Sequence, residues 1–281
     1  MSVLKIKKIL FTFKHLKIYL GESKRTSNFA SNRAAFMECF VADNYGWLLC
    51  QIKDGDVVID AGANIGMFVL QASKAVGEKG KVIAIEPDST NLQYLKENIV
   101  YNNIKNVEIL ERALYRSDDE VLLFSGQGVF GKISEKGKEV ISISLKSLLI
   151  ELLKNKTRIF LKMDIEGGEE AAFEDSELIG YLKELSAIAY EIHSENANRL
   201  VGDALRSSGF WLSKIYHDHD FKLNIVKSTL RHPILFGRLY GLAIFTVAKR
   251  VLIIGKKSYE QFKPGMIYAL KYDLSPNETF D

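Results

Sequence analysis

The chain has 281 residues, of which 47% are hydrophobic and 26% charged, so its composition excludes a disordered or collagen-like protein. A chain of this length can fold without disulfides or structural metals, and Cys39 and Cys50 fit neither framework. The net charge of +3 conceals an acidic body, with a net charge of −9 over residues 28–221, between basic segments at 1–27 (+6) and 222–263 (+8).

The N-terminal segment lacks the uninterrupted apolar run of a secretory signal, because lysines recur every few positions. We therefore expect a cytoplasmic protein. Residues 4–20 mix apolar and basic side chains and are interpreted as a basic amphipathic helix within an N-terminal helical extension over 1–50. Such a helix packs on its own domain or docks on a membrane, so residues 1–27 are a candidate site of peripheral membrane contact.

From residue 56, short apolar runs rich in β-branched residues alternate with helical stretches. This alternation predicts an α/β fold with a mostly parallel sheet covered by helices on both faces. Additional short strands are expected within 112–144. Strands are predicted at 56–62, 81–87, 107–110, 158–164, 185–193, 210–217 and 266–273, and helices at 66–77, 90–101 and 145–154.

A second basic segment, residues 222–263, interrupts this pattern. It is apolar, but its longest charge-free stretch, Leu239 to Ala248, has ten residues and is too short to span a bilayer. We expect a helical insertion before the last strand, which could be a lid, a dimer face, an interfacial anchor or simple packing. The predicted division is therefore 1–50 extension, 51–221 core, 222–263 insertion and 264–281 final strand and tail.

The strongest local signal is the sequence VVIDAGANIG, in which a strand runs into a glycine turn and then a helix. Gly62 allows a tight turn and close approach of a ligand, and Gly66 allows close packing of the helix on the strand. Twenty residues later Glu86 ends the next strand, where a carboxylate can accept hydrogen bonds from ribose hydroxyls. Together these features predict an adenosine-containing ligand.

The residue types of the turn distinguish two cofactors. A dinucleotide fold favours G-x-G-x-x-G, whereas this turn has a single acidic residue, Asp60, ahead of Gly62. An acidic residue suits the ammonium group of S-adenosylmethionine, and the amides at the start of the helix suit its carboxylate. We therefore favour S-adenosylmethionine.

The ends of two later strands carry the candidate catalytic residues. Asp164 follows the fourth strand and faces the reactive group, or else caps the next helix. His193 ends the neighbouring strand with Glu191 on the same face, and it either acts as a base near neutral pH or is structural. Asp164, Glu166 and Glu191 could hold magnesium, but no compact ligand spacing indicates a divalent metal, so no metal ligand is assigned.

Several motifs between about Glu38 and His193 resemble those of the FkbM family of S-adenosylmethionine-dependent methyltransferases. They are FVADNYGWLL, DVVIDAGANIG, VIAIEPD, ERAL, LKMDIEGGEE and YEIH, in that order. The resemblance implies a Rossmann-like, seven-stranded class I methyltransferase fold and O-methylation of a sugar or natural-product hydroxyl. Lys146, where the family usually has aspartate, and the segment 222–263 depart from the family pattern and bear on the acceptor.

The resemblance also implies roles for individual residues. Positions matching the family motifs would hold the methionine end of the cofactor, its ribose and adenine, and the reacting groups. The methionine end would be held by Asp60, Gly62, Ala63, Asn64 and Gly66. The ribose and adenine would be held by Glu86, Asp88, Glu111 and Ala113. The reacting groups would be Asp164 and Glu166, with His193 as the other candidate base.

We therefore predict an O-methyltransferase that acts on a small-molecule or glycan hydroxyl. An RNA methyltransferase is the alternative, because the basic segments could meet phosphates. The sequence DIEG in place of an NPPY-like motif, and no recognised RNA-binding module, argue against nucleic acid. A membrane-associated scaffold without activity would not need the glycine turn together with Glu86. The sequence leaves the acceptor and the oligomeric state open.

Overall fold

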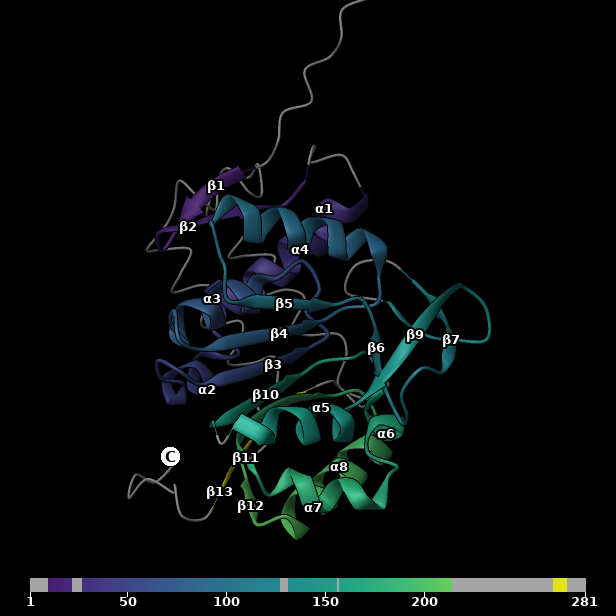
Figure 1. Cartoon of the computed structure of the whole chain (residues 1–281). Helices are drawn as coiled ribbons and strands as arrows, with labels where there is room; N and C mark the ends of the chain where they lie inside the picture. The colour runs from purple at the N-terminus through teal and green to yellow at the C-terminus, as the bar shows by residue number, and fades with distance from the viewer. Residues whose placement is uncertain (1–9, 22–26, 127–130, 156, 214–264, 272–281) are drawn as a thin grey trace, which may run out of the picture.

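The computed structural model describes residues 10–21, 27–126, 131–155, 157–213 and 265–271. The predicted insertion at 222–263 lies outside these residues. The main sheet has the strand order β12-β13-β11-β10-β3-β4-β5 (Figure 1). Its strands are β3 (Val57–Ala61), β4 (Lys81–Ile85), β5 (Val107–Leu110), β10 (Ile159–Met163), β11 (Leu185–Ile192), β12 (Phe210–Leu212) and β13 (Gly265–Lys271). The central strands are parallel, as the sequence predicted, and β13 is antiparallel to both of its neighbours.

Helices cover both faces of this sheet. Alternate strand residues enter two apolar clusters, with Val58 in one and Ile59 in the other. Because both faces are buried, the strands are apolar at nearly every position. One face carries α3 (Met67–Ala75) and α4 (Ser89–Tyr101), and the other α5 (Leu145–Leu152), α6 (Glu169–Ala172), α7 (Ile179–Leu182) and α8 (Glu195–Ser207).

The predicted N-terminal helix is wrong over the described part of its range. Residues 10–19 form a hairpin of β1 (Leu10–Phe13) and β2 (Leu16–Tyr19), with positive φ angles at the turn residues Lys14 and His15. Phe13, Leu16 and Ile18 are buried, whereas Lys17 is exposed. The segment therefore follows the two-residue period of a strand, which so short a stretch does not distinguish from a helical period.

Residues 27–51 of the chain are mostly helical. They contain α1 (Ser27–Phe36), the π-helical turn η1 (Met37–Val41) and α2 (Gly46–Gln51). Hairpin and helices share one apolar cluster with α3, α4 and the sheet. The proposed domain boundaries stay a prediction, because the packing between these parts is continuous.

Two asparagines of α4 attach the hairpin to the sheet domain. The Asn98 side chain accepts a hydrogen bond from Tyr19 N (2.8 Å) and donates to Tyr19 O (3.2 Å) and Ile65 O (3.0 Å). Asn102 makes the same pair of contacts with Lys17, each of 2.7 Å. The amide side chains thus satisfy the edge of β2, and Asn98 also fixes the glycine turn at Ile65.

A second, four-stranded sheet lies beside the carboxyl ends of the central strands (Figure 1). It consists of β6 (Ala113–Tyr115), β7 (Val121–Ser125), β8 (Lys132–Ile133) and β9 (Lys138–Ser144). The short strands expected within 112–144 are confirmed, and β8, which has only two residues, is an addition to them. Within the described residues, no helix has the length and apolarity needed to cross a bilayer.

Candidate active site

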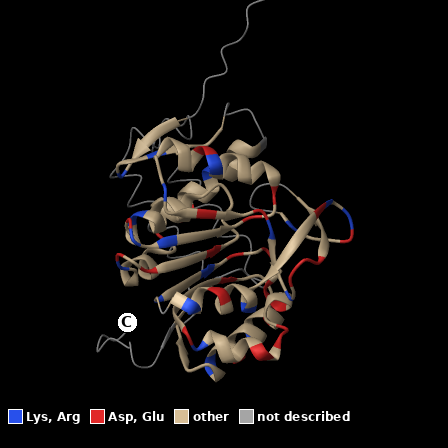
Figure 2. Ribbon diagram, viewed as in Figure 1, with Lys and Arg blue, Asp and Glu red and all other residues tan. Residues whose placement is uncertain are grey.

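A cavity of about 360 Å³ opens at the carboxyl ends of the parallel strands. Three parts of the chain form its walls: the glycine turn with the strand ends, the small sheet, and the N-terminal helices. Parallel α/β sheets bind ligands at this edge, and the volume lies within the usual range of ligand pockets. In Figure 2, acidic positions lie at the ends of central strands on the side that faces the small sheet.

The glycine turn has the backbone geometry that the sequence predicted. Gly62 has a φ of +79°, and a Cβ atom there would lie 1.8 Å from the carbonyl oxygen of Asp164. Gly66 has a φ of +86°, and a Cβ would lie 2.5 Å from Leu95 Cδ1. The close neighbour of Gly66 is therefore helix α4, and not the preceding strand as we had expected. Both positions require glycine for conformation and for space.

Glu86 lies at the end of β4 and faces the cavity. Its Oε2 accepts a hydrogen bond from Asn64 N and its Oε1 from Asp88 N, each at 2.8 Å. Burial raises the pKa of Glu86 to about 7. A carboxylate oxygen can accept two hydrogen bonds, so Oε2 has capacity for another donor from a ligand in the cavity.

Asp60 lies beneath the turn and is fully buried. Its Oδ1 is 3.1 Å from Nζ of Lys162, the residue opposite it on β10, and Nζ also donates to Gly62 O at 2.7 Å. Burial lowers the pKa of Lys162, but the charges of Asp60 and Asp164 outweigh it and raise that pKa. Asp60 is absent from the described cavity wall. Its contact with a cofactor ammonium therefore stays a prediction.

The other predicted cofactor residues divide into two groups. Gly62, Ala63, Asn64, Glu86 and Ala113 line the cavity. Gly66, Asp88 and Glu111 are not part of the described wall. Asp88 caps α4 by accepting hydrogen bonds from two of its amides, and Glu111 forms an exposed ion pair with Lys96 at 2.5 Å.

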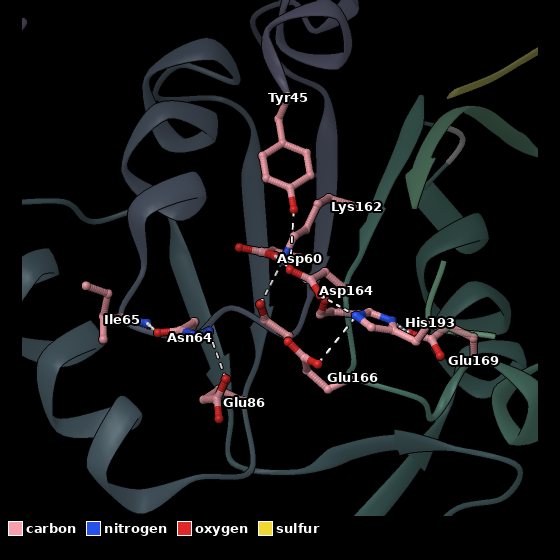
Figure 3. Close-up of polar contacts among 12 residues, drawn as sticks. Tyr45, Asp60, Asn64, Ile65, Glu86, Lys162, Asp164, Glu166, Glu169 and His193 are labelled. Carbon is pink, nitrogen blue, oxygen red and sulfur yellow. Dashed lines mark hydrogen bonds and ion pairs between the residues drawn. The ribbon is translucent and has the colours of Figure 1, made fainter. Parts of the chain in front are cut away.

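The predicted catalytic residues meet at the other end of the cavity, opposite Glu86 (Figure 3). His193 Nε2 lies 3.8 Å from Asp164 Oδ1 and 3.4 Å from Glu166 Oε2. Its Nδ1 lies 2.7 Å from Oε1 of the fully buried Glu169. Because a carboxylate only accepts hydrogen bonds, this contact requires the proton on Nδ1 and directs Nε2 toward the cavity.

Tyr45 of the N-terminal extension joins this cluster. Its hydroxyl donates to Asp164 Oδ2 at 3.4 Å, and its ring lies 5.5 Å from Lys162 Nζ. The Asp164 amide donates to Ala61 O (3.0 Å), which holds the residue at the end of the β3–β10 ladder. Asp164 therefore lies between the glycine turn and His193.

Burial and repulsion between carboxylates shift the titration of the cluster. Burial, followed by the charge of Asp164, raises the pKa of Glu191 to about 9 and that of Glu166 to about 7. Burial alone would lower the pKa of His193, but its hydrogen bond to Glu169 and the surrounding carboxylates raise it to about 9. The raised pKa values reflect the crowding of carboxylates around His193, an arrangement that favours a positively charged group.

Three residues of the site were not predicted as such from the sequence: Tyr45, Lys162 and Glu169. A lysine inside the apolar strand IFLKM was a signal, because a buried lysine needs an acidic partner. Tyr45 and Glu169 stand in the family motifs FVADNYGWLL and LKMDIEGGEE, but the motifs did not indicate their partners, which lie far away in the sequence.

The strand order, the glycine turn and the acidic end of β4 together define the class I fold of S-adenosylmethionine-dependent methyltransferases. The methyltransferase FkbM domain matches residues 60–223. This match covers more than half of the chain, so the chain belongs to the FkbM methyltransferase family, as the sequence motifs indicated.

Similar proteins include a probable cobalt-precorrin-6B C(15)-methyltransferase of Sulfurisphaera tokodaii, 35% identical over 102 residues, which are 35% of this chain and 50% of that protein. The corresponding protein of Sulfolobus acidocaldarius is 32% identical over 107 residues, 34% of this chain and 56% of its own. The chain thus spans about half the length of these curated relatives. A solved precorrin-6y C5,15-methyltransferase from Geobacter metallireducens has a TM-score of 0.39 and 13% identity, with 90% of this chain and 94% of that chain covered.

The cavity residues fit the cofactor of this family. Glu86 retains an acceptor position for a ribose hydroxyl, and Ala113 contributes an apolar surface to the same cavity. The carboxylates around Asp164 complement a cationic sulfonium. Gly62, Ala63, Asn64, Glu86 and Ala113 are therefore the residues that would hold S-adenosylmethionine.

Proposed function

We propose that the protein transfers a methyl group from S-adenosylmethionine to a hydroxyl oxygen of a neutral acceptor, such as a sugar or a glycan. The observation that carries the proposal is the His193 cluster. It combines an oriented imidazole with two carboxylates, and it lies at the end of the cavity opposite Glu86.

The chain's own residues have two tasks in this reaction. S-adenosylmethionine, when bound, supplies a methyl carbon that is already activated by the sulfonium charge. The chain must align the acceptor oxygen, exclude water and remove the hydroxyl proton, since an alcohol has a high pKa. Glu166, whose pKa is raised only to about 7, and His193, which can accept the proton only after losing the one that its pKa of about 9 retains, are the candidate proton acceptors. Glu169 is a positioning residue that orients the imidazole.

The charge of the cavity supports a neutral acceptor over RNA. Lys162, one of the basic residues in the wall, is already paired with Asp60, whereas carboxylates predominate around His193. A polyanion entering the cavity would meet repulsion from these groups. Contact of a membrane-linked acceptor with residues 1–27 and 222–263 is a further part of the proposal, carried by their basic sequence.

The test combines binding and turnover. Calorimetric titration with S-adenosylmethionine should show one site per chain, and absence of binding would refute every methyltransferase assignment. Labelled cofactor incubated with separated glycan, lipid, RNA and protein fractions should label the glycan or glycolipid. Labelling of RNA alone would instead establish the alternative.

A substitution pair tests the cluster. His193→Gln should leave cofactor affinity within about twofold and lower turnover roughly 10²- to 10⁴-fold. The matched control is His15→Gln, because His15 lies in the exposed turn of the N-terminal hairpin. Unchanged turnover in His193→Gln would remove His193 from the mechanism.

A further inference from the structure

We infer that the active site holds a divalent metal ion, ligated by Asp164, Glu191 and His193. The sequence indicated no such site, because its acidic residues had no compact spacing. In the fold, one ligand atom from each of these three side chains lies within 4.8 Å of the other two. The role of the ion in the reaction rests on the proposed function, whereas the binding of the ion does not.

The distances between the three ligand atoms suit a small hard cation. Octahedral coordination at about 2.1 Å places ligand atoms about 3.0 Å apart in cis positions and about 4.2 Å apart in trans positions. The distance from Asp164 Oδ1 to His193 Nε2 is 3.8 Å, which lies between these values. The three ligand atoms all lie within 4.8 Å of one another, so movements of less than about 1 Å bring them to these separations.

The hydrogen bonds around the three ligands favour a cation between them. Glu169 accepts the Nδ1 hydrogen bond, so Nε2 is directed at carboxylate oxygens of Asp164 and Glu166, where a metal ion would replace the Nε2 proton as the positive charge between them. Asp164 Oδ1 is buried and accepts no hydrogen bond from the described part of the chain. A histidine held from behind by a buried carboxylate is the usual arrangement around a metal-bound imidazole.

An ion can reach the site from the cavity, and the three protein ligands leave some of its coordination positions open. All three ligands line the cavity, so an ion can enter from the same side as the acceptor. Three protein ligands leave coordination positions for water or for an acceptor oxygen. With Nε2 occupied as a ligand, Glu166 is left to receive the proton when the hydroxyl O–H bond breaks. The acceptor oxygen would then bond to the methyl carbon as the methyl C–S bond of the cofactor breaks and S-adenosylhomocysteine leaves.

Manganese binding to the full-length, metal-stripped protein tests the inference directly. Titration followed by the electron paramagnetic resonance signal of free Mn²⁺ should show one bound ion per chain. Asp164→Asn and Glu191→Gln should each weaken binding at least tenfold. The matched control is Asp203→Asn, since Asp203 forms an exposed ion pair with Arg206 on α8 and should bind Mn²⁺ as the unchanged protein does.

Two outcomes would overturn the inference. One is a protein that binds S-adenosylmethionine but no Mn²⁺ at 1 mM, on the order of the weaker cation sites of proteins. The other is Mn²⁺ binding that both carboxylate variants leave unchanged. Mn²⁺ binding without any cofactor binding would instead refute the proposed function and leave the metal site standing.

A second measurement uses no variant, so it tests the metal site even if the substituted proteins fail to fold. In unchanged protein labelled with ¹³C-histidine, bound Mn²⁺ should broaden the His193 resonance and leave that of His15 in the hairpin sharp. A sharp His193 resonance at saturating Mn²⁺ would exclude the site without any substitution.

Discussion

Substituting Lys162 tests whether a buried ion pair supports the cofactor turn. Lys162→Met keeps the length of the side chain and removes its charge. The lysine is 4% exposed and its partner Asp60 is fully buried, with 3.1 Å between Nζ and Oδ1. The substitution therefore leaves a carboxylate buried without its counter-charge, and it also removes the donor to Gly62 O.

The expected cost follows from these contacts. Removal of one partner of a buried pair costs about 3–5 kcal/mol, because the remaining charge is uncompensated. Loss of the hydrogen bond to Gly62 O adds about 1 kcal/mol. In the double variant Asp60→Asn/Lys162→Met neither charge is buried. Its destabilisation should therefore be at least about 1 kcal/mol smaller than the sum of the two single effects.

Urea unfolding of the cofactor-free protein, followed by circular dichroism, measures these free energies. The control is Lys96→Met, which breaks the exposed pair with Glu111 and should change stability by no more than about 0.5 kcal/mol. If Lys162→Met costs no more than this control, or if the double variant is additive, Lys162 does not stabilise the turn through Asp60.

Three further predictions concern the turn, the hairpin and the charge cluster. Gly62→Ala places a Cβ atom 1.8 Å from Asp164 O, so S-adenosylmethionine affinity should fall about 100-fold by calorimetry; unchanged affinity would contradict the geometry. Asn98→Ala removes three hydrogen bonds to backbone groups of the hairpin and turn and should cost about 2–4 kcal/mol in urea unfolding, and a cost under about 1 kcal/mol would exclude this role. Because the pKa values of Glu191 and His193 are raised to about 9, the folded protein holds more protons than the unfolded chain above pH 6. The stability from these protons is lost as pH rises toward 9, so the cofactor-free protein should melt at a lower temperature at pH 9 than at pH 6, and Glu191→Gln should reduce the difference.

Much of the fold could be predicted from the sequence because its signals are local. A buried strand followed by a glycine turn is encoded within about ten residues, and Gly62 and Gly66 have the positive φ angles that only glycine adopts easily. The end of a parallel strand is also a local feature, which is why Asp164 and His193 could be assigned to the same edge of the sheet. The hairpin at 10–19 was missed because a short apolar–basic segment fits either period.

The tertiary structure alone decided which side chains meet. Strand register pairs Lys162 with Asp60, and so gives Asp60 a counter-charge within the chain. Folding of the loop after β10 brings the buried Glu169 to His193, and the N-terminal helices bring Tyr45 to Asp164. Periodicity specifies the face on which a residue lies, but not its neighbour across a gap of many residues. That neighbour depends on how the strands and helices pack, and here it determined the charge and the chemistry of the site.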